Sequence, residues 1–373
     1  MEIVVFDSFD GDLESLFREF EKEWCWSPFQ TFGWLSFWYK SVGDPVHSIK
    51  AQIVVLSDQG RTIAILPLGI RRINCVKVLE WLGGIHADYM GALITKDYQL
   101  SARDFIALWT DVSKRLLKFD VIHFQRQPMM IGDVENPFVI YFHTQKSEVA
   151  FQAVINGGWE EFQKSRLSKK LIADSKRQIR RLQEKGELLF SVAEDVGELE
   201  EVIKKMIDFK RKRYFDTGLS DMFAIDEHRV FFQGLLNVNL EKYKLCCASL
   251  KIDHEIIATH VGFISNERFY YYMPANDNER WKPFSPGRLL MEFLMEWSLK
   301  EGKYTFDFTV GGEDYKKIWC NNEFALFDYM EPHNIRGEIF YVLTKQLRML
   351  RANKKFTDLL KRIRIFRRSL HCK

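Results

Sequence analysis

A short run of small and polar residues, Ser285-Pro286-Gly287-Arg288, lies where a helix is predicted to begin after a strand. The unpaired backbone N–H groups and the dipole of a helix start attract anions such as a pyrophosphate or a carboxylate. Arg288 would add positive charge. We therefore expect Ser285, Gly287 and Arg288 to bind an anionic cofactor or donor. The alternative is an ordinary helix start with Ser285 as its cap.

Two aspartates in the same region have the chemistry of a proton acceptor. Asp307 lies inside a predicted buried strand between Phe306 and Phe308, and Asp277 lies in the turn after another strand. A carboxylate buried among apolar residues must be hydrogen-bonded or have a shifted pKa. Either aspartate is therefore a candidate catalytic base or an anchor for an amine. The alternative for Asp307 is a structural role in holding a neighbouring loop.

Candidate substrate ligands come from a tyrosine-rich strand and from a glycine-rich loop. Along the strand 268–273, alternation places two tyrosines on one face, where phenols can orient a substrate or protonate a leaving group. Gly311 and Gly312 allow a close backbone approach before a polar run. Aromatic packing beneath a helix and an ordinary surface turn are the alternatives. The candidate substrate-binding residues are Tyr270, Tyr272, Glu313, Tyr315, Lys316 and Trp319.

Sequence motifs for several other chemistries are absent. The six cysteines are scattered without C-x-x-C spacing, which argues against a zinc site or a disulfide framework. The chain also lacks the dinucleotide, P-loop, zinc-peptidase and nucleophile-elbow motifs, so hydride transfer, phosphoryl transfer from ATP and serine hydrolysis have no support. His260 is expected to be an ordinary core histidine. We expect no metal.

Length, composition and charge bound the class of protein. The 373 residues suffice for two domains, and 46% apolar with 28% charged residues is ordinary for a globular protein. No apolar run reaches the roughly 18 residues that span a bilayer, and no signal peptide is recognisable, so we expect a cytoplasmic protein. Residues 345–373 carry eleven Lys and Arg against one acid, and residues 164–185 carry nine against two. This asymmetry indicates an anionic partner, and the tail has the spacing of a helix that contacts an anionic membrane.

The elements that position these residues recur in the same order in both halves of the chain. Between the halves, the sequence predicts a basic helix over 159–187 and a second helix over 198–214. The repetition predicts an α/β protein with two copies of one unit, each a mixed sheet flanked by helices. We expect domains at 1–155 and 156–335 and a basic helical tail at 336–373. The predicted strand, strand, strand, helix and strand are 50–56, 62–71, 76–82, 102–117 and 120–125 in the first half, and 245–252, 256–265, 268–273, 286–300 and 303–308 in the second.

Several stretches resemble the acetyltransferase domain of CelD-type cellulose-biosynthesis proteins, a branch of the GNAT superfamily related to the FemAB peptidoglycan-bridge enzymes. The likeness spans roughly residues 20–335 and is most specific near its C-terminal end. It implies a tandem pair of GNAT-like domains. The stretches that carry it are Pro28–Trp38, Leu66–Leu68, Trp81–Gly84 with Asp88-Tyr89, Arg177–Gly186, Asp277, Ser285–Gly287, Phe306-Asp307 and Gly312–Lys316.

The resemblance also implies an N-acyltransferase, in which an amine attacks an acyl thioester directly. Gly287 and Arg288 match the helix start that receives the donor pyrophosphate, although the usual glycine-rich loop is shortened here. We expect acyl-CoA or a related thioester as donor, and an amino sugar or other small amine of cell-surface polysaccharide metabolism as acceptor. Two alternatives stay open. One is FemAB-like transfer from aminoacyl-tRNA, held by the basic helix near Arg177–Arg181. The other is a non-catalytic, membrane-peripheral accessory protein.

Overall fold

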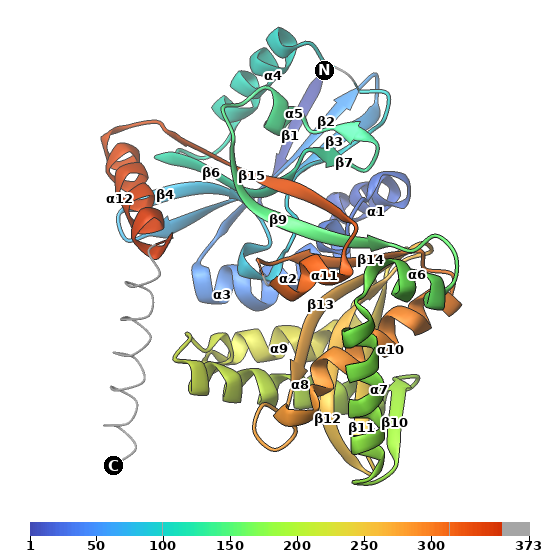
Figure 1. Ribbon diagram of the computed structural model, residues 1–373. Coiled ribbons are helices and arrows are strands. Elements are labelled where there is room, and N and C mark those ends of the chain that lie inside the picture. The colour runs from blue at the N-terminus through green and yellow to red at the C-terminus, as the bar shows by residue number, and fades with distance from the viewer. Residues whose placement is uncertain (99, 313, 353–373) are drawn as a thin grey trace, which may run out of the picture. The chain divides into compact units, whose positions relative to one another are not determined.

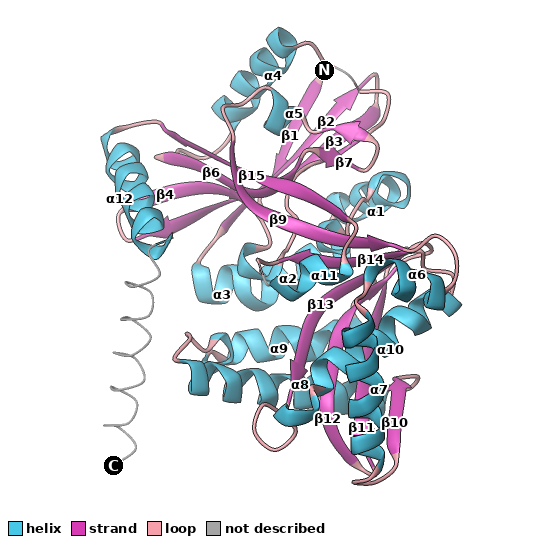
Figure 2. Cartoon of the chain, in the orientation of Figure 1, coloured by secondary structure: helices cyan, strands magenta, loops and turns pink. Residues whose placement is uncertain are grey.

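The structure, a computed structural model, describes residues 1–98, 100–312 and 314–352 (Figures 1 and 2). The chain forms two compact units. Both are discontinuous in sequence, because short segments of the chain pass from one unit to the other. Unit 1 consists of Met1–Val149, Val238–Glu241 and Phe324–Leu350, and the described part of unit 2 consists mainly of Ala150–Asn237 and Lys242–Glu323.

Unit 1 is built on a mixed sheet with the strand order β1-β2-β3-β4-β6-β15. Neighbouring strands run antiparallel except β4 and β6, which are parallel and are connected through a helix. The strands of this unit are β1 (Glu2–Phe6), β2 (Lys50–Asp58), β3 (Arg61–Ile73), β4 (Val76–Trp81), β5 (Leu93–Ile94), β6 (Val121–Pro128), β7 (Met130–Ile131), β8 (Val134–Glu135) and β15 (Asn322–Pro332).

Aromatic side chains hold the helix between β4 and β6 against the sheet of unit 1. Trp109 packs edge-to-face on Phe124 of β6 with ring centroids 5.7 Å apart, and Phe124 stacks on Trp81 of β4 at 4.5 Å. All three rings are buried, so they supply much apolar area to the core. The helices and short helical turns of this unit are α1 (Asp12–Trp24), η1 (Pro28–Gln30), α2 (Phe32–Trp38), η2 (Tyr39–Gly43), α3 (Asp44–His47), η3 (Gly84–His86), α4 (Ala102–Arg115), α5 (Pro137–Ile140) and α12 (Ile335–Ala352).

Unit 2 has a sheet with the order β10-β11-β12-β13-β14-β9. Here β13 and β14 are the parallel pair, and the other neighbours run antiparallel. The β-branched and aromatic residues of these strands suit a sheet that is covered on both faces. The strands are β9 (Gln145–Val154), β10 (Leu188–Val192), β11 (Lys244–Ile252), β12 (Glu255–Ile264), β13 (Arg268–Asn276) and β14 (Thr305–Val310).

Helices cover both faces of the unit 2 sheet. Trp297 of α10 packs edge-to-face on Phe269, whereas Phe232 of α9 stacks on Tyr272. Phe269 and Tyr272 point to opposite faces because side chains alternate along β13. The helices are α6 (Trp159–Arg166), α7 (Lys169–Gln183), α8 (Val196–Thr217), η4 (Met222–Ala224), α9 (Asp226–Gly234), η5 (Leu235–Asn237), η6 (Lys282–Phe284), α10 (Pro286–Lys300) and α11 (Asp314–Trp319).

The two sheets have the same topology, which confirms the predicted duplication. The order β2-β3-β4-α4-β6 of unit 1 matches β11-β12-β13-α10-β14 of unit 2, and each ends in a parallel pair. Beyond that pair the sixth strand is exchanged. Unit 1 is completed by β15, which follows unit 2 in the chain, and unit 2 by β9, which follows α5 of unit 1.

One predicted helix differs from the observed structure, and another is described only in part. The basic segment 159–187 forms α6 and α7 rather than a single helix, because Ser168 accepts a hydrogen bond from the Leu171 N–H and starts a new helix. The C-terminal helix α12 begins at Ile335, and the tail from residue 353 onward lies outside the described residues. Within the described residues, no helix is long and apolar enough to cross a membrane.

Candidate functional site

A cavity of about 300 Å³ lies at the start of α10 in unit 2. Parallel pairing joins β13 to β14 only from Arg268 to Tyr270, and β13 continues unpaired on that side to Asn276, so the strand pair opens next to the helix start. Among the described residues of the lining, three side chains are basic and none is acidic. The lining consists of Arg213, Tyr271, Pro274, Asn276, Asn278, Lys282, Ser285, Pro286, Gly287, Arg288, Met291, Tyr315 and Trp319.

The backbone at the helix start has an unusual conformation. Ser285 adopts a left-handed φ of 55°, which costs about 1–2 kcal/mol for a residue with a Cβ. Its side chain does not cap α10, so the alternative of an ordinary serine cap is not what the structure contains. The N–H groups of Arg288 and Leu289 both donate to the Ser285 carbonyl. Fewer N–H groups are thus available to an anion than the sequence suggests. The Gly287 N–H is the donor of the first helical turn that these two hydrogen bonds do not use.

Gly287 makes room for a neighbouring amide. A Cβ at this position would lie 2.7 Å from Asn276 Oδ1. The Asn276 Nδ2 group donates to Asn278 Oδ1 and to the Asp277 carbonyl, at 3.0 and 3.2 Å. The turn after β13 is therefore hydrogen-bonded within itself, and its amide groups lie against the start of α10.

The three basic side chains of the cavity differ in what holds them. Arg288 donates to Asp174 Oδ2 at 2.6 Å and to Ser175 Oγ at 2.8 Å, both on α7. Arg213 of α8 and Lys282 of η6 are exposed, and within the described part of the chain neither forms an ion pair. The charge available to an anion in the cavity therefore comes mainly from Arg213 and Lys282, while Arg288 joins α10 to α7.

The contact between α7 and α10 contains two carboxyl groups whose pKa values are shifted in opposite directions. Burial opposes ionisation of Asp174, but the hydrogen bonds from Arg177 and Arg288 hold its pKa below the usual range. Glu292 of α10 accepts a 2.6 Å hydrogen bond from Ser175. Its burial raises its pKa to about 6, although the Ser175 hydrogen bond and the Arg288 charge lower it. This contact fixes α7 beside the cavity.

Of the three tyrosines in β13, the middle one lines the cavity. Tyr271 stacks on His260 and contacts Phe308, whereas the predicted ligands Tyr270 and Tyr272 point to the opposite face. Tyr270 packs on Tyr243 there, and Tyr272 on aromatic residues of the core. Alternation placed Tyr270 and Tyr272 together as expected, but it could not say which face the cavity is on.

Of the substrate ligands predicted in the loop 311–319, some line the cavity and others do not. Tyr315 and Trp319 of α11 line the cavity, with Tyr315 38% exposed and Trp319 buried. Lys316 is buried instead, and its Nζ donates to the carbonyls of Phe308 and Val310 at 3.0 and 2.9 Å. Glu313 lies outside the described residues.

The two candidate aspartates lie outside the cavity lining. Asp307 is fully buried, and its oxygens accept hydrogen bonds from Gln152 Nε2 at 2.9 Å, Arg268 Nη1 at 3.4 Å and the Thr309 N–H at 2.8 Å. Asp277 accepts from the Glu279 N–H at 2.7 Å, which closes the turn after β13. These contacts hold β14, β9 and the turn in place.

His260 is buried in the core, as the sequence suggested. Its Nε2 accepts the Tyr272 N–H across a bulge between β12 and β13, and burial lowers its pKa to about 3. The imidazole therefore accepts the hydrogen bond that a backbone carbonyl of β12 would accept in a regular sheet, and it stays neutral. It does not line the cavity.

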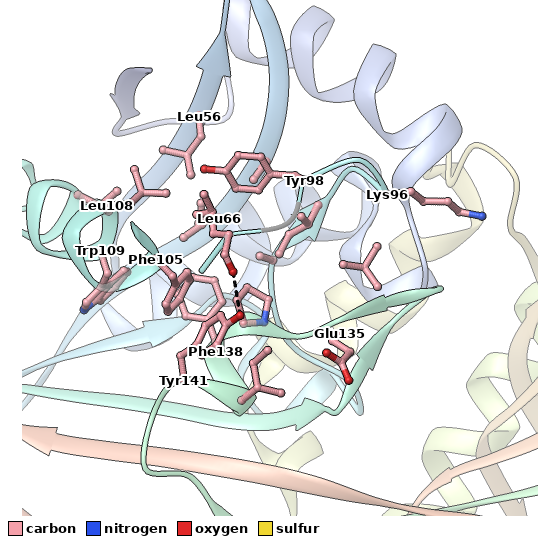
Figure 3. A pocket seen from close by; sticks show the side chains of 18 of the residues that line it. Leu56, Leu66, Lys96, Tyr98, Phe105, Leu108, Trp109, Glu135, Phe138 and Tyr141 are labelled. Carbon is pink, nitrogen blue, oxygen red and sulfur yellow. Dashed lines mark hydrogen bonds between the residues drawn. The ribbon is translucent and has the colours of Figure 1, made fainter. Parts of the chain in front are cut away.

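Unit 1 has a cavity of about 340 Å³, but its lining is mostly apolar (Figure 3). Leu56, Leu66, Phe105, Trp109 and Phe138 surround it, between the sheet and α4. Its Lys96 forms an ion pair with Asp133.

The turn after β4 in unit 1 is packed into the core. His86 Nδ1 accepts a hydrogen bond from Trp38 Nε1 at 3.1 Å, and Gly84 lies against the Trp38 ring. Its counterpart in unit 2 borders the basic cavity. The turn after the third strand therefore borders a basic cavity in unit 2 and is packed into the core in unit 1.

The comparison with known families bears on this arrangement of strands and cavity. Residues 169–317 match the family described as Acetyltransferase (GNAT) domain, a stretch that includes α7, α10 and most of the cavity lining. The chain has a tandem GNAT fold. A sequence search of curated proteins gives no significant match.

Solved structures share this fold at low sequence identity. FemX is similar over 92% of this chain and 99% of its own, with 11% identity and a TM-score of 0.60. A conserved protein of unknown function from Bacteroides thetaiotaomicron has a TM-score of 0.54 at 13% identity, covering 88% of this chain and 99% of its own. A tandem GNAT protein from the clavulanic acid biosynthesis pathway has a TM-score of 0.50 at 9% identity, covering 89% of this chain and 98% of its own. At these identities the likeness shows the fold alone.

Four polar residues that line the cavity are not among the site residues predicted from the sequence. Asn276 and Asn278 flank Asp277 in the turn that had been noticed, and Lys282 follows in the same loop, so a polar-turn signal was present. Arg213 lies on α8, far from the loop in sequence, and carried no signal.

Proposed function

We propose that this protein is an N-acyltransferase that binds the anionic end of an acyl thioester, such as acyl-CoA, in the cavity at the start of α10. The observation that carries the proposal is the presence of three basic side chains, Arg213, Lys282 and Arg288, in the described lining beside the start of α10, which lies inside the stretch that matches the GNAT family. Lys282 and Arg213 would hold phosphate groups, and the Gly287 N–H would add a backbone donor.

The reaction needs little more from the protein than positioning. The amine nitrogen attacks the carbonyl carbon of the thioester and the C–S bond breaks, while the amine loses one proton and the departing thiolate gains one. In the described lining the titratable groups other than the basic ones are the phenols of Tyr271 and Tyr315. We assign Tyr315, which is partly exposed, as the proton donor to the departing sulfur, and the proton that the amine loses to solvent is matched by the one that solvent returns to the phenolate.

The acceptor in this proposal is an amino sugar or another small amine of cell-surface polysaccharide metabolism. Its support is the resemblance to CelD-type proteins. The test is an assay of the full chain with acetyl-CoA and longer acyl-CoAs as donors and a panel of amino sugars and simple amines as acceptors. The reaction is monitored through the free thiol that it releases. Amine-dependent thiol release supports the proposal. No release with any donor and amine would leave the non-catalytic alternative.

A second candidate is transfer from aminoacyl-tRNA, which the exposed basic face of α7 favours. Lys169, Lys170, Lys176 and Arg180 are exposed on this helix, and among the described residues they form no ion pair. A tRNA held by these side chains would bind more weakly as salt rises, because phosphate contacts release counterions. A gel shift with charged tRNA at rising salt measures this. A missing or salt-insensitive shift would exclude this function.

A further inference from the structure

The C-terminal helix α12 presents a continuous apolar face to solvent. Its apolar residues on this face are exposed by between 45%, for Leu350, and 80%, for Ile335. The 3.6-residue period of an α-helix places all of them on one side of α12. Single exposed apolar residues are ordinary, but a contiguous stripe marks an interaction site. The stripe consists of Ile335, Ile339, Val342, Leu343, Leu347, Met349 and Leu350.

The opposite side of α12 is fixed to unit 1, so the apolar face is turned outward by the fold. Gly337 is buried so closely that a Cβ there would lie 2.0 Å from the Asp120 carbonyl oxygen. Arg348 donates to Asp328 Oδ2 at 2.7 Å, and its guanidinium lies 3.0 Å from His123 Nε2. Rotating the helix to bury the stripe would break these contacts. Figure 1 shows α12 at the periphery of unit 1.

Positive charge accompanies the apolar face. Arg336 and Lys345 are exposed on α12, and residues 345–373 carry eleven Lys and Arg against a single acid. Basic charge next to an exposed apolar stripe is the pattern of a helix that lies in the interface of an anionic bilayer. A second copy of the chain would bring two such basic segments together, and their repulsion opposes that pairing.

We propose that α12 docks unit 1 on an anionic phospholipid surface, with the apolar stripe inserted among the lipids and the basic residues contacting the head groups. The proposal rests on α12 and its charge and not on the acyl-transfer site. It places the protein where amine acceptors at the membrane surface are within reach.

The test is flotation of the full chain with phosphatidylcholine vesicles that contain phosphatidylglycerol, and with vesicles of phosphatidylcholine alone. We expect binding to the anionic vesicles that falls as salt rises, and little binding to the neutral ones. The variant Ile339→Glu/Leu343→Glu should bind at least about tenfold more weakly, since each carboxylate must be taken out of water. The matched control, Ile225→Glu/Val230→Glu, changes two apolar residues of unit 2 that are also exposed and should bind like the parent.

Light scattering on the same variants gives the second readout. The proposal predicts a single mass for the parent and the Ile339→Glu/Leu343→Glu variant, with unchanged thermal unfolding because both side chains are exposed. A parent dimer that this variant dissociates would overturn the proposal in favour of self-association. Equal vesicle binding by parent and variant, or no binding by the parent at low salt, would also overturn it.

Discussion

Replacing Asp307 by asparagine tests whether this carboxylate acts on the structure or on the reaction. The side chain is fully buried in β14, and it accepts hydrogen bonds from Gln152, Arg268 and the Thr309 N–H among others. Asparagine has one acceptor oxygen and one donor amide in the same shape. Its amide must therefore face a donor, and at least one hydrogen bond is replaced by a donor-to-donor contact.

The expected cost follows from these contacts. A hydrogen bond to a buried carboxylate contributes about 1.5–3 kcal/mol, and breaking a buried ion pair costs about 3–5 kcal/mol. The Arg268 side chain is 37% exposed and 3.4 Å away, so solvent screens that pair and the larger figure does not apply in full. We expect Asp307→Asn to lower the free energy of unfolding by about 2–4 kcal/mol.

Urea unfolding and steady-state kinetics at low temperature separate the two roles. The control Glu301→Gln changes an exposed carboxylate of the same unit and should alter stability by less than about 0.5 kcal/mol. If Asp307 is a positioning residue, the folded Asp307→Asn protein keeps most of its kcat. Unchanged stability together with a loss of kcat greater than about 10²-fold would refute the reasoning and make Asp307 a general base.

Three further outcomes follow from other contacts. Burial raises the pKa of Glu292 to about 6 from an ordinary 4.5, so the stability that this group contributes is present below about pH 4.5 and is lost as the pH rises through 6, by about 2 kcal/mol. In urea unfolding measured below pH 4.5 and above pH 6, the variant Glu292→Gln should not show this loss, and the same loss of stability in parent and variant would contradict the prediction. The variant Ala64→Leu should fill the apolar cavity of unit 1 and raise the free energy of unfolding by about 1–2 kcal/mol, whereas the control Ala153→Leu, at a buried position outside that cavity, should lower it by about 1–3 kcal/mol. A lower free energy of unfolding in Ala64→Leu would show that the cavity cannot accept a larger side chain. Tyr315→Phe should lower kcat by about 10²-fold with KM nearly unchanged, and an equal kcat would remove the phenol from the reaction.

Local sequence patterns were enough to predict most of the elements. The helices α4 and α10 and the three strands before each lie within a few residues of the predicted ranges. These signals are local, since they come from periodicity and turn residues. The exchange of β9 and β15 between the units involves pairing between residues far apart in the sequence, and no local signal reports it.

The candidate site shows the same limit at the level of side chains. The helix start at Ser285 and Gly287 was located from residue types alone, because proline and glycine mark such a position. Arg288 was assigned to the same anion, but Asp174 on a distant helix binds its guanidinium. Tyr271 lines the cavity and Tyr270 does not, because the helices that cover each face of β13 decide which side chains reach the cavity.

The central claim is that the cavity at the start of α10 binds the anionic end of an acyl donor. Isothermal titration of acetyl-CoA into the full chain measures this directly. We expect saturable binding that weakens about fivefold in Lys282→Ala and in Arg213→Ala, corresponding to about 1 kcal/mol for each exposed cation, and that is unchanged in Lys244→Ala, an exposed cation of the same unit outside the cavity. No heat of binding with millimolar acetyl-CoA or longer acyl-CoAs, or equal affinity in all three variants, would contradict the claim.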